Sequence, residues 1–195
     1  MSGLKQTPSQ TVGPYFAYGL TARQYNYPQT SIAEGAMAGE DVAGERIRVE
    51  GRVFDGDGVP IPDAMIEIWQ ADAQGRFAHP ADPRNSNTGF TGFGRFGTGT
   101  DPKNRFIFDT IKPGSGAAAA DEAPHLNVIV FMRGLLTHVY TRIYFADEAE
   151  ANAADPVLSA VPEDRRHTLI AAREGDTYRF DIHMQGENET VFFDV

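Results

Sequence analysis

The histidines are the first side chains to test for chemistry, because imidazole is both a common metal ligand and an acid–base group. The chain holds five of them. His125 and Asn127 lie two apart in a stretch typical of a strand, so their side chains point to one face. A His-x-His pair would form half of a metal site, but transition metals bind an amide only weakly. A packing or hydrogen-bonding role is therefore favoured for His125. No ligand-spaced companion accompanies His138, His167 or His183.

Other motifs of catalysis or cofactor binding are missing from the sequence. The chain has no cysteine, which excludes thiolate nucleophiles, disulfides and cysteine metal sites. It contains no G-x-S-x-G nucleophile elbow and no G-x-x-x-x-G-K-[ST] phosphate loop, and no dinucleotide-binding glycine fingerprint follows a predicted strand. The acidic stretch 55–58 lacks the further oxygen ligands and the closing glutamate of a calcium loop. We expect a simple turn there.

The charge balance excludes two classes of partner. The chain has 27 acidic and 17 basic residues, a net charge of -10. Nucleic acid and anionic membrane surfaces both attract clustered Lys and Arg, so neither is an expected partner. The sequence has no run near the roughly 18 apolar residues that span a bilayer and no signal-like N-terminus. We expect a bacterial cytoplasmic protein.

From residue 46 onward, short stretches of alternating apolar and polar residues predict strands. Ile47, Val49 and Val53, for example, alternate with charged residues. Strands separated by Gly- and Pro-rich loops predict an all-β fold, an antiparallel β-sandwich over 46–195. The connections carry one or two short helices, at 147–154 and 162–172, and a small-residue loop at 114–120. The predicted strands are 47–53, 64–70, 105–109, 125–131, 138–145, 178–184 and 189–195.

Residues 1–45 differ from the rest of the chain. They contain prolines, glycines and several tyrosines but no sustained helical or strand period. Some 40 residues without regular structure are unusual inside a compact domain. Tyrosine side chains nevertheless favour burial. An extended N-terminal arm that packs on a partner chain satisfies both observations, and an arm folded over its own domain is the alternative.

Six short motifs follow one another along the chain: TPSQTVGPY at 7–15, EIWQAD at 67–72, TIKPG at 110–114, APH at 123–125, YRFDI at 178–182 and QGENETVFFD at 185–194. Together, and in this order, they resemble the intradiol ring-cleaving dioxygenases. Within that family they are most similar to the alpha chain of its two-chain members. The resemblance therefore implies a homologous beta chain as partner, in a higher-order hetero-oligomer of αβ units.

The resemblance also implies a metal pocket that has lost its ligands. In the family, the catalytic chain binds ferric iron through two tyrosinates and two histidines. The matching positions here are Phe77, Gly116, His125 and Asn127, so one ligand of four is kept.

The charges around this vestigial pocket have changed as well. Glu122 replaces an arginine of the family pattern, and Arg142 replaces a glutamine. Two tyrosinates and a hydroxide neutralise a ferric ion, whereas one neutral imidazole leaves its buried charge uncompensated, at a large energetic cost. We therefore expect no metal in this chain, and Fe(III) held by the beta chain of the assembled enzyme.

The remaining role implied by the resemblance is to complete the substrate pocket of the beta chain. The resemblance implies protocatechuate as the substrate, which would be cleaved with O2 to 3-carboxy-cis,cis-muconate. The residues assigned to substrate binding are Thr11, Gly13, Pro14, Tyr15 and Arg133. Pro14 and Tyr15 would give the ring an apolar wall, and a guanidinium can bind the carboxylate. No catalytic residue is expected in this chain itself.

Two other functions remain open from the residues. One is a single-chain iron dioxygenase with an unrecognised ligand set. The other is a β-sandwich that serves as a non-enzymatic binding or scaffold module. Iron content and the presence of a homologous partner chain separate these three hypotheses.

Overall fold

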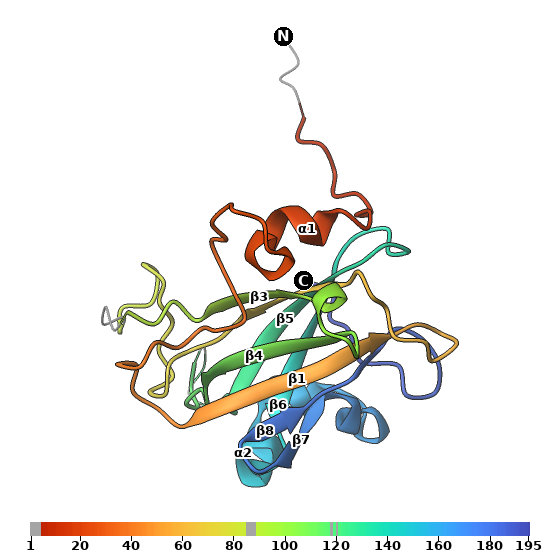
Figure 1. The fold of residues 1–195 in the computed structure, drawn as a ribbon. Helices are drawn as coiled ribbons and strands as arrows, with labels where there is room; N and C mark the ends of the chain where they lie inside the picture. The colour runs from red at the N-terminus through yellow and green to blue at the C-terminus, as the bar shows by residue number, and fades with distance from the viewer. Residues whose placement is uncertain (1–4, 85–88, 118, 120) are drawn as a thin grey trace.

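A computed structural model describes residues 5–84, 89–117, 119 and 121–195. Nine strands of these residues form one continuous sheet in the order β3-β2-β5-β6-β7-β8-β1-β4, with β9 paired to β1 (Figure 1). The all-β prediction is confirmed. No helix within the described ranges is long and apolar enough to cross a membrane. The strands are β1 (Arg46–Phe54), β2 (Met65–Trp69), β3 (Phe93–Gly97), β4 (Arg105–Ile111), β5 (His125–Phe131), β6 (Val139–Phe145), β7 (Ile170–Glu174), β8 (Thr177–Arg179) and β9 (Ile182–His183).

The sheet is mixed, which corrects the predicted antiparallel sandwich. Strand β7 runs parallel to β6, and β8 and β9 run parallel to β1. A parallel neighbour requires a crossover connection. Helices α2 (Ala149–Ala154), α3 (Pro156–Ala160) and η3 (Glu163–Leu169) form that crossover between β6 and β7. The two ends of the strand path approach each other, since the rings of Phe96 on β3 and Phe108 on β4 lie 6.2 Å apart. The result is a nearly closed, barrel-like sheet.

Three local predictions were wrong. Strand β3 was missed because it contains Gly94 and Gly97, which have low strand propensity. A Cβ at Gly94 would lie 2.5 Å from the sulfur of Met37, so that flexible side chain would have to move. Strand β7 begins at Ile170, inside the segment predicted as a helix. The stretch 189–195 forms only an isolated bridge, between Phe193 and Tyr140, rather than a strand.

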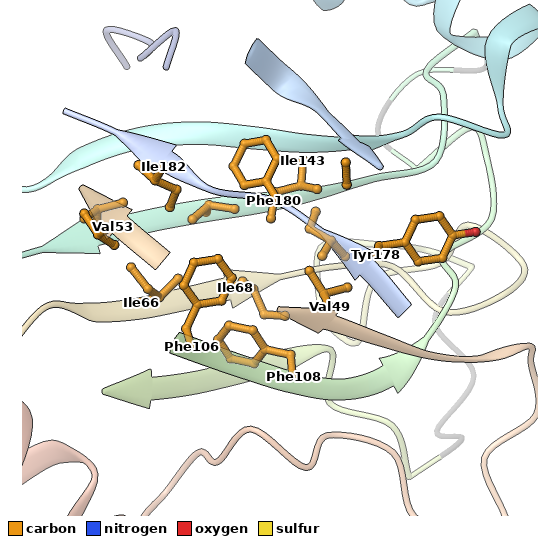
Figure 2. Close-up of a cluster of buried hydrophobic side chains, with 14 of the residues drawn as sticks. Val49, Val53, Ile66, Ile68, Phe106, Phe108, Ile143, Tyr178, Phe180 and Ile182 are labelled. Atoms are coloured by element: carbon orange, nitrogen blue, oxygen red, sulfur yellow. The ribbon is translucent and has the colours of Figure 1, made fainter. Parts of the chain in front are cut away.

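The hydrophobic core fills the inside of the curved sheet (Figure 2). The alternating apolar residues of β1 point inward as predicted, and Val49 and Val53 are fully buried. Gly51 lies between them, where a Cβ would come within 1.7 Å of the Phe180 carbonyl oxygen. The largest buried contributions come from aromatic and branched side chains, which remove the most apolar area from water. They include Ile66, Ile68, Phe106, Phe108, Leu126, Ile143, Phe145 and Tyr178.

The N-terminal segment divides into two parts. Residues 5–11 and 13–15 are exposed, and this stretch extends away from the sheet (Figure 1). Helix α1 (Phe16–Leu20) and the 3-10 turn η1 (Ala22–Tyr25) instead pack on the domain, with Ala17 and Ala22 buried. Further on, the backbone N–H groups of Met37 and Asp109 bond to carbonyls of the opposite segment, so this part runs alongside β4. The segment therefore has both an extended arm and a part folded on its own sheet.

We expect Phe108→Ala to lower the free energy of unfolding of the chain by about 3–5 kcal/mol, because it leaves a cavity among fully buried neighbours. Urea denaturation measures this change. Leu136→Ala is the control, since Leu136 is 88% exposed and its removal should cost little. Equal losses for the two variants would contradict this assignment of the core.

Candidate functional site

His125 begins strand β5 on the face of the sheet opposite the core. Its neighbours Leu126 and Val128 point into the core, whereas His125 and Asn127 share the outer face, as predicted. The crossover helices cover this end of the face, and His125 is only 3% exposed. Its Nδ1 lies 2.8 Å from the carbonyl oxygen of Ala123. Because a carbonyl only accepts, Nδ1 carries the proton and Nε2 keeps its lone pair.

Two buried titratable groups of this region are held in their neutral forms. Burial, and after it the positive charge of Arg142, lower the pKa of His125. Burial also raises the pKa of Tyr144, whose ring lies 5.8 Å from the imidazole. The Tyr144 hydroxyl donates to Asp155 Oδ1 over 3.0 Å, so it is a phenol and not a tyrosinate.

Phe77 stacks in parallel on Trp69, with 5.8 Å between the ring centroids. Both rings line a cavity of about 530 Å³, whose lining also includes His79, residues 81–84 and Ala117. The backbone N–H of Phe77 donates to Asp82, whose carboxylate also accepts from Arg84. Phe77 therefore lies at the cavity wall as an apolar ring, with no oxygen to offer a metal.

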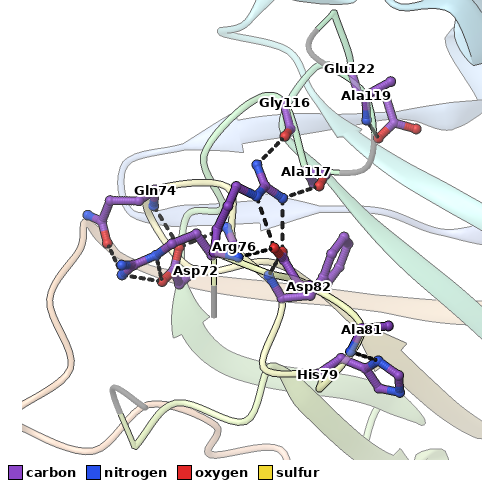
Figure 3. Close-up of polar contacts among 12 residues, drawn as sticks. Asp72, Gln74, Arg76, His79, Ala81, Asp82, Gly116, Ala117, Ala119 and Glu122 are labelled. Atoms are coloured by element: carbon purple, nitrogen blue, oxygen red, sulfur yellow. Dashed lines mark hydrogen bonds and ion pairs between the residues drawn. The ribbon is translucent and has the colours of Figure 1, made fainter. Parts of the chain in front are cut away.

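Gly116 lies in the loop that faces the same cavity. Its N–H donates to the carbonyl oxygen of Glu122 over 2.8 Å. Its own carbonyl accepts from Arg84 over 3.0 Å, and Figure 3 shows the bond at this carbonyl. Gly116 has a φ of 70°, a conformation that glycine adopts readily. Arg84 thus joins the loops that carry Phe77 and Gly116. Phe77 stacks on Trp69, which lies opposite Asn127 in the β2–β5 register. Gly116 bonds to Glu122, which precedes His125 by three residues.

This set of residues does not fit a ferric ion. Of the four positions only His125 offers a donor suited to a transition metal, and that donor is a neutral nitrogen. The Asn127 amide instead donates to the Trp69 carbonyl oxygen, over 3.4 Å. Across the described residues, no three or more His, Cys, Asp or Glu side chains gather where they could hold a metal. Fe(III) requires anionic oxygen ligands, which these positions lack.

The two charged substitutions seen in the sequence form a buried ion pair, which sequence reasoning did not anticipate. Both terminal nitrogens of Arg142 lie 3.2 Å from Glu122 Oε1. The Glu122 side chain is 6% exposed and that of Arg142 is 18% exposed. Arg142 lies opposite Asn127 in the β5–β6 register. The paired replacement of an arginine by an acid and of a glutamine by an arginine was the available signal.

The residues predicted to bind substrate lie at the opposite end of β5. Arg133 follows that strand, its side chain is 60% exposed, and its Nε lies 2.9 Å from Asp63. The rings of Phe16, at the base of the arm, and Phe131 lie 5.5 Å apart. Figure 1 shows the arm rising beside the loop that joins β5 and β6.

The arm residues of this set are open to solvent. Tyr15 is 81% exposed, and a Cβ at Gly13 would meet nothing within 4 Å. Thr11 and Pro14 are exposed too. The structure therefore brings the arm base and Arg133 to the end of β5 that lies opposite His125. These residues do not reach the pocket beside His125.

We expect the melting temperature of the chain to fall as the pH decreases from about 7.5 to about 5.5. The unfolded chain carries an ordinary histidine with a pKa near ~6.5, whereas burial lowers the pKa of His125 in the folded chain. Below a pH of about 6.5, the unfolded chain binds more protons at this histidine than the folded chain does, so a fall in pH favours unfolding. His125→Gln should reduce the dependence, as followed by differential scanning calorimetry. An unchanged slope in His125→Gln would contradict the neutral, buried imidazole.

Comparisons with known proteins indicate the family of the chain. The dioxygenase family model matches residues 12–186. The protocatechuate 3,4-dioxygenase alpha chain of Burkholderia cepacia is 56% identical over 200 residues, covering 100% of both chains. The beta chain from the same organism is 32% identical and covers 82% of this chain and 72% of its own length.

A solved structure supports the fold. The crystal structure of 3-chlorocatechol 1,2-dioxygenase from Rhodococcus opacus 1CP superposes with a TM-score of 0.55 at 24% identity. The match covers 91% of this chain and 71% of that one. The family model spans most of the residues, and a relative is similar in sequence over its full length. The chain therefore belongs to the intradiol dioxygenase family.

Proposed function

We propose that this chain is the alpha subunit of a protocatechuate 3,4-dioxygenase and that it completes the substrate pocket of an iron-bearing beta chain. The observation that carries the proposal is a full-length likeness to an alpha chain, combined with a family metal pocket whose donors do not suit iron. The assembled enzyme is an oxidoreductase that cleaves protocatechuate with O2 to 3-carboxy-cis,cis-muconate. Fe(III), held by the beta chain, supplies the binding of the catechol oxygens and the activation of the ring.

The N-terminal arm is the part of the chain proposed to pack on the partner. Residues 5–11 and 13–15 have few contacts with their own domain, although Tyr15 and Pro14 are the kind of apolar surface that favours burial. In the assembled enzyme, these two side chains would line one wall of the substrate pocket. Gly13 would allow the partner or the substrate to approach the backbone closely, and Thr11 offers a hydroxyl.

Arg133 is proposed to bind the substrate carboxylate. Its guanidinium is exposed, with Nε 2.9 Å from a carboxylate oxygen of Asp63, and its terminal N–H groups can donate to a carboxylate. In a chain of net charge -10, one guanidinium directed at the pocket also offsets repulsion of an anionic substrate. Its contribution is therefore to position the substrate, and bond breaking occurs on the partner.

The higher-order arrangement is part of the same proposal. A homologous beta chain is known for the relative, and several αβ units would assemble into the complete enzyme. We also propose that the protein is bacterial and that it is cytoplasmic. The bacterial origin of the relatives supports the first of these two properties.

Co-expression with a homologous chain that keeps two tyrosines and two histidines tests the function. We expect the chains to co-purify, ring cleavage to require both, and iron to be present at one ion per pair. Stoichiometric iron and activity in this chain alone would instead identify a single-chain dioxygenase. Failure to pair with the homologous chain would favour a binding or scaffold module.

Arg133→Ala in the assembled enzyme should raise KM for protocatechuate roughly tenfold or more with kcat little changed, since a charge-assisted hydrogen bond contributes about 1.5–3 kcal/mol. Steady-state kinetics measure both constants. Arg48→Ala is the matched control, because Arg48 is 48% exposed and pairs with Asp109 at 2.7 Å, on β1 and β4. A KM that Arg133→Ala does not change would remove Arg133 from the substrate pocket.

A further inference from the structure

The vestigial pocket still contains one imidazole that could bind a metal. The His125 Nδ1–H is bound to the Ala123 carbonyl, so Nε2 is left with its lone pair, the arrangement found in metal-binding histidines. Divalent ions such as Co²⁺ and Zn²⁺ accept imidazole together with carboxylate. Loss of the two tyrosines therefore explains why Fe(III) does not fit, but it does not by itself keep a divalent cation out.

A carboxylate is also present beside this imidazole. Glu122 lies three residues before His125 on the same loop and strand, is buried, and accepts a hydrogen bond from the Ala119 N–H over 3.2 Å. Its negative charge acts on the His125 imidazole. A buried carboxylate next to an imidazole would attract a cation unless a counter-charge is already in place.

Arg142 supplies that counter-charge from the facing strand. Its guanidinium contacts Glu122 Oε1 with two nitrogens at 3.2 Å, and one of these lies 3.4 Å from the Tyr144 hydroxyl oxygen. Its guanidinium lies 3.4 Å from the hydroxyl of Tyr144, whose ring lies 5.8 Å from the imidazole, so its positive charge disfavours a second cation at His125. The positive charge of this pocket thus belongs to the Arg142 side chain, which extends from β6 to the loop before β5.

We propose that the Arg142–Glu122 ion pair takes over the electrostatic and structural role that a metal ion would have in this pocket. The guanidinium balances the buried carboxylate, joins β6 to the loop before β5, and excludes divalent cations from His125. This inference rests on the proposed function in one respect, that the pocket is the counterpart of the partner's iron site. It predicts that metal binding can be restored only when the guanidinium is removed.

The test uses cobalt as the probe and the assembled αβ enzyme as the protein. Asn127→His adds a second imidazole on the face of His125, and equilibrium dialysis with metal analysis counts cobalt separately from iron. We expect Asn127→His to gain little Co²⁺ over the unmodified enzyme. Asn127→His with Arg142→Gln should bind Co²⁺ at least tenfold more tightly. Asn127→His with Arg142→Lys should stay weak, because the lysine keeps the positive charge.

A matched control separates the local charge from the loss of any arginine. Arg105 forms a part-buried ion pair with Glu50 at 2.9 Å, on β4 and β1. Asn127→His with Arg105→Gln should bind Co²⁺ no better than Asn127→His. Two results would overturn the proposal: equal cobalt affinity in the double variants that carry Arg142→Gln and Arg142→Lys, or tight binding by Asn127→His alone.

A thermal measurement tests the structural half. Arg142→Gln should lower the melting temperature by at least about 4 °C, since it leaves the buried Glu122 without its counter-charge. Adding Glu122→Gln should recover more than half of that loss. No loss, or no recovery, would contradict a structural role. Iron in the unmodified alpha chain would overturn the proposed function instead, so the two failures are distinguishable.

Discussion

The charge balance at the start of β5 is the constraint on which the rest of this molecule depends. His125, Tyr144 and Asp155 are all buried there, and burial makes any uncompensated charge costly. The structure meets this requirement with a neutral imidazole, a neutral phenol and the ion pair of Glu122 with Arg142. Asp155 accepts from the Leu158 N–H as well, which ties the N-terminus of α3 to the same network.

The fold separates this pocket from the surface that can serve a partner. Strand β5 begins at His125 and ends at Phe131. The base of the arm packs against Phe131. The crossover helices bury the first end, whereas Arg133 and the arm beyond the second end are exposed. A single strand thus connects a pocket that lacks the anionic oxygen ligands of Fe(III) with the residues proposed to act on a neighbouring chain. In this account, the family fold is kept as a scaffold for positioning.

Much of the fold could be predicted from alternation and turn residues. The β1 pattern of Ile47, Val49 and Val53 placed three core residues correctly, and the turn after Phe54 is present. The parallel neighbours could not be predicted, because the crossover is made of short helical pieces whose direction depends on how Leu158 and Leu169 pack. Strand β3 was not predicted either, since it contains Gly94 and Gly97, which have low strand propensity.

The candidate site was predictable to a different degree. Motif resemblance assigned Phe77, Gly116, His125 and Asn127 to one pocket, an assignment that periodicity alone could not make. The pairing of Glu122 with Arg142 depends on the register between β6 and the end of a loop, 20 residues apart in the chain, and that register is a tertiary property. One sequence does not specify which residues of a second chain the arm contacts. The role of the arm is therefore a proposal, which the exposure of its residues supports.

The central claim is that the ferric iron of the assembled enzyme lies only in the partner chain, whereas this chain balances its pocket with an ion pair. X-ray diffraction from crystals of the αβ complex at the iron absorption edge tests this claim most directly. We expect one anomalous peak per αβ pair, located in the beta chain, and none beside His125. An iron peak within bonding distance of the His125 Nε2 would contradict it.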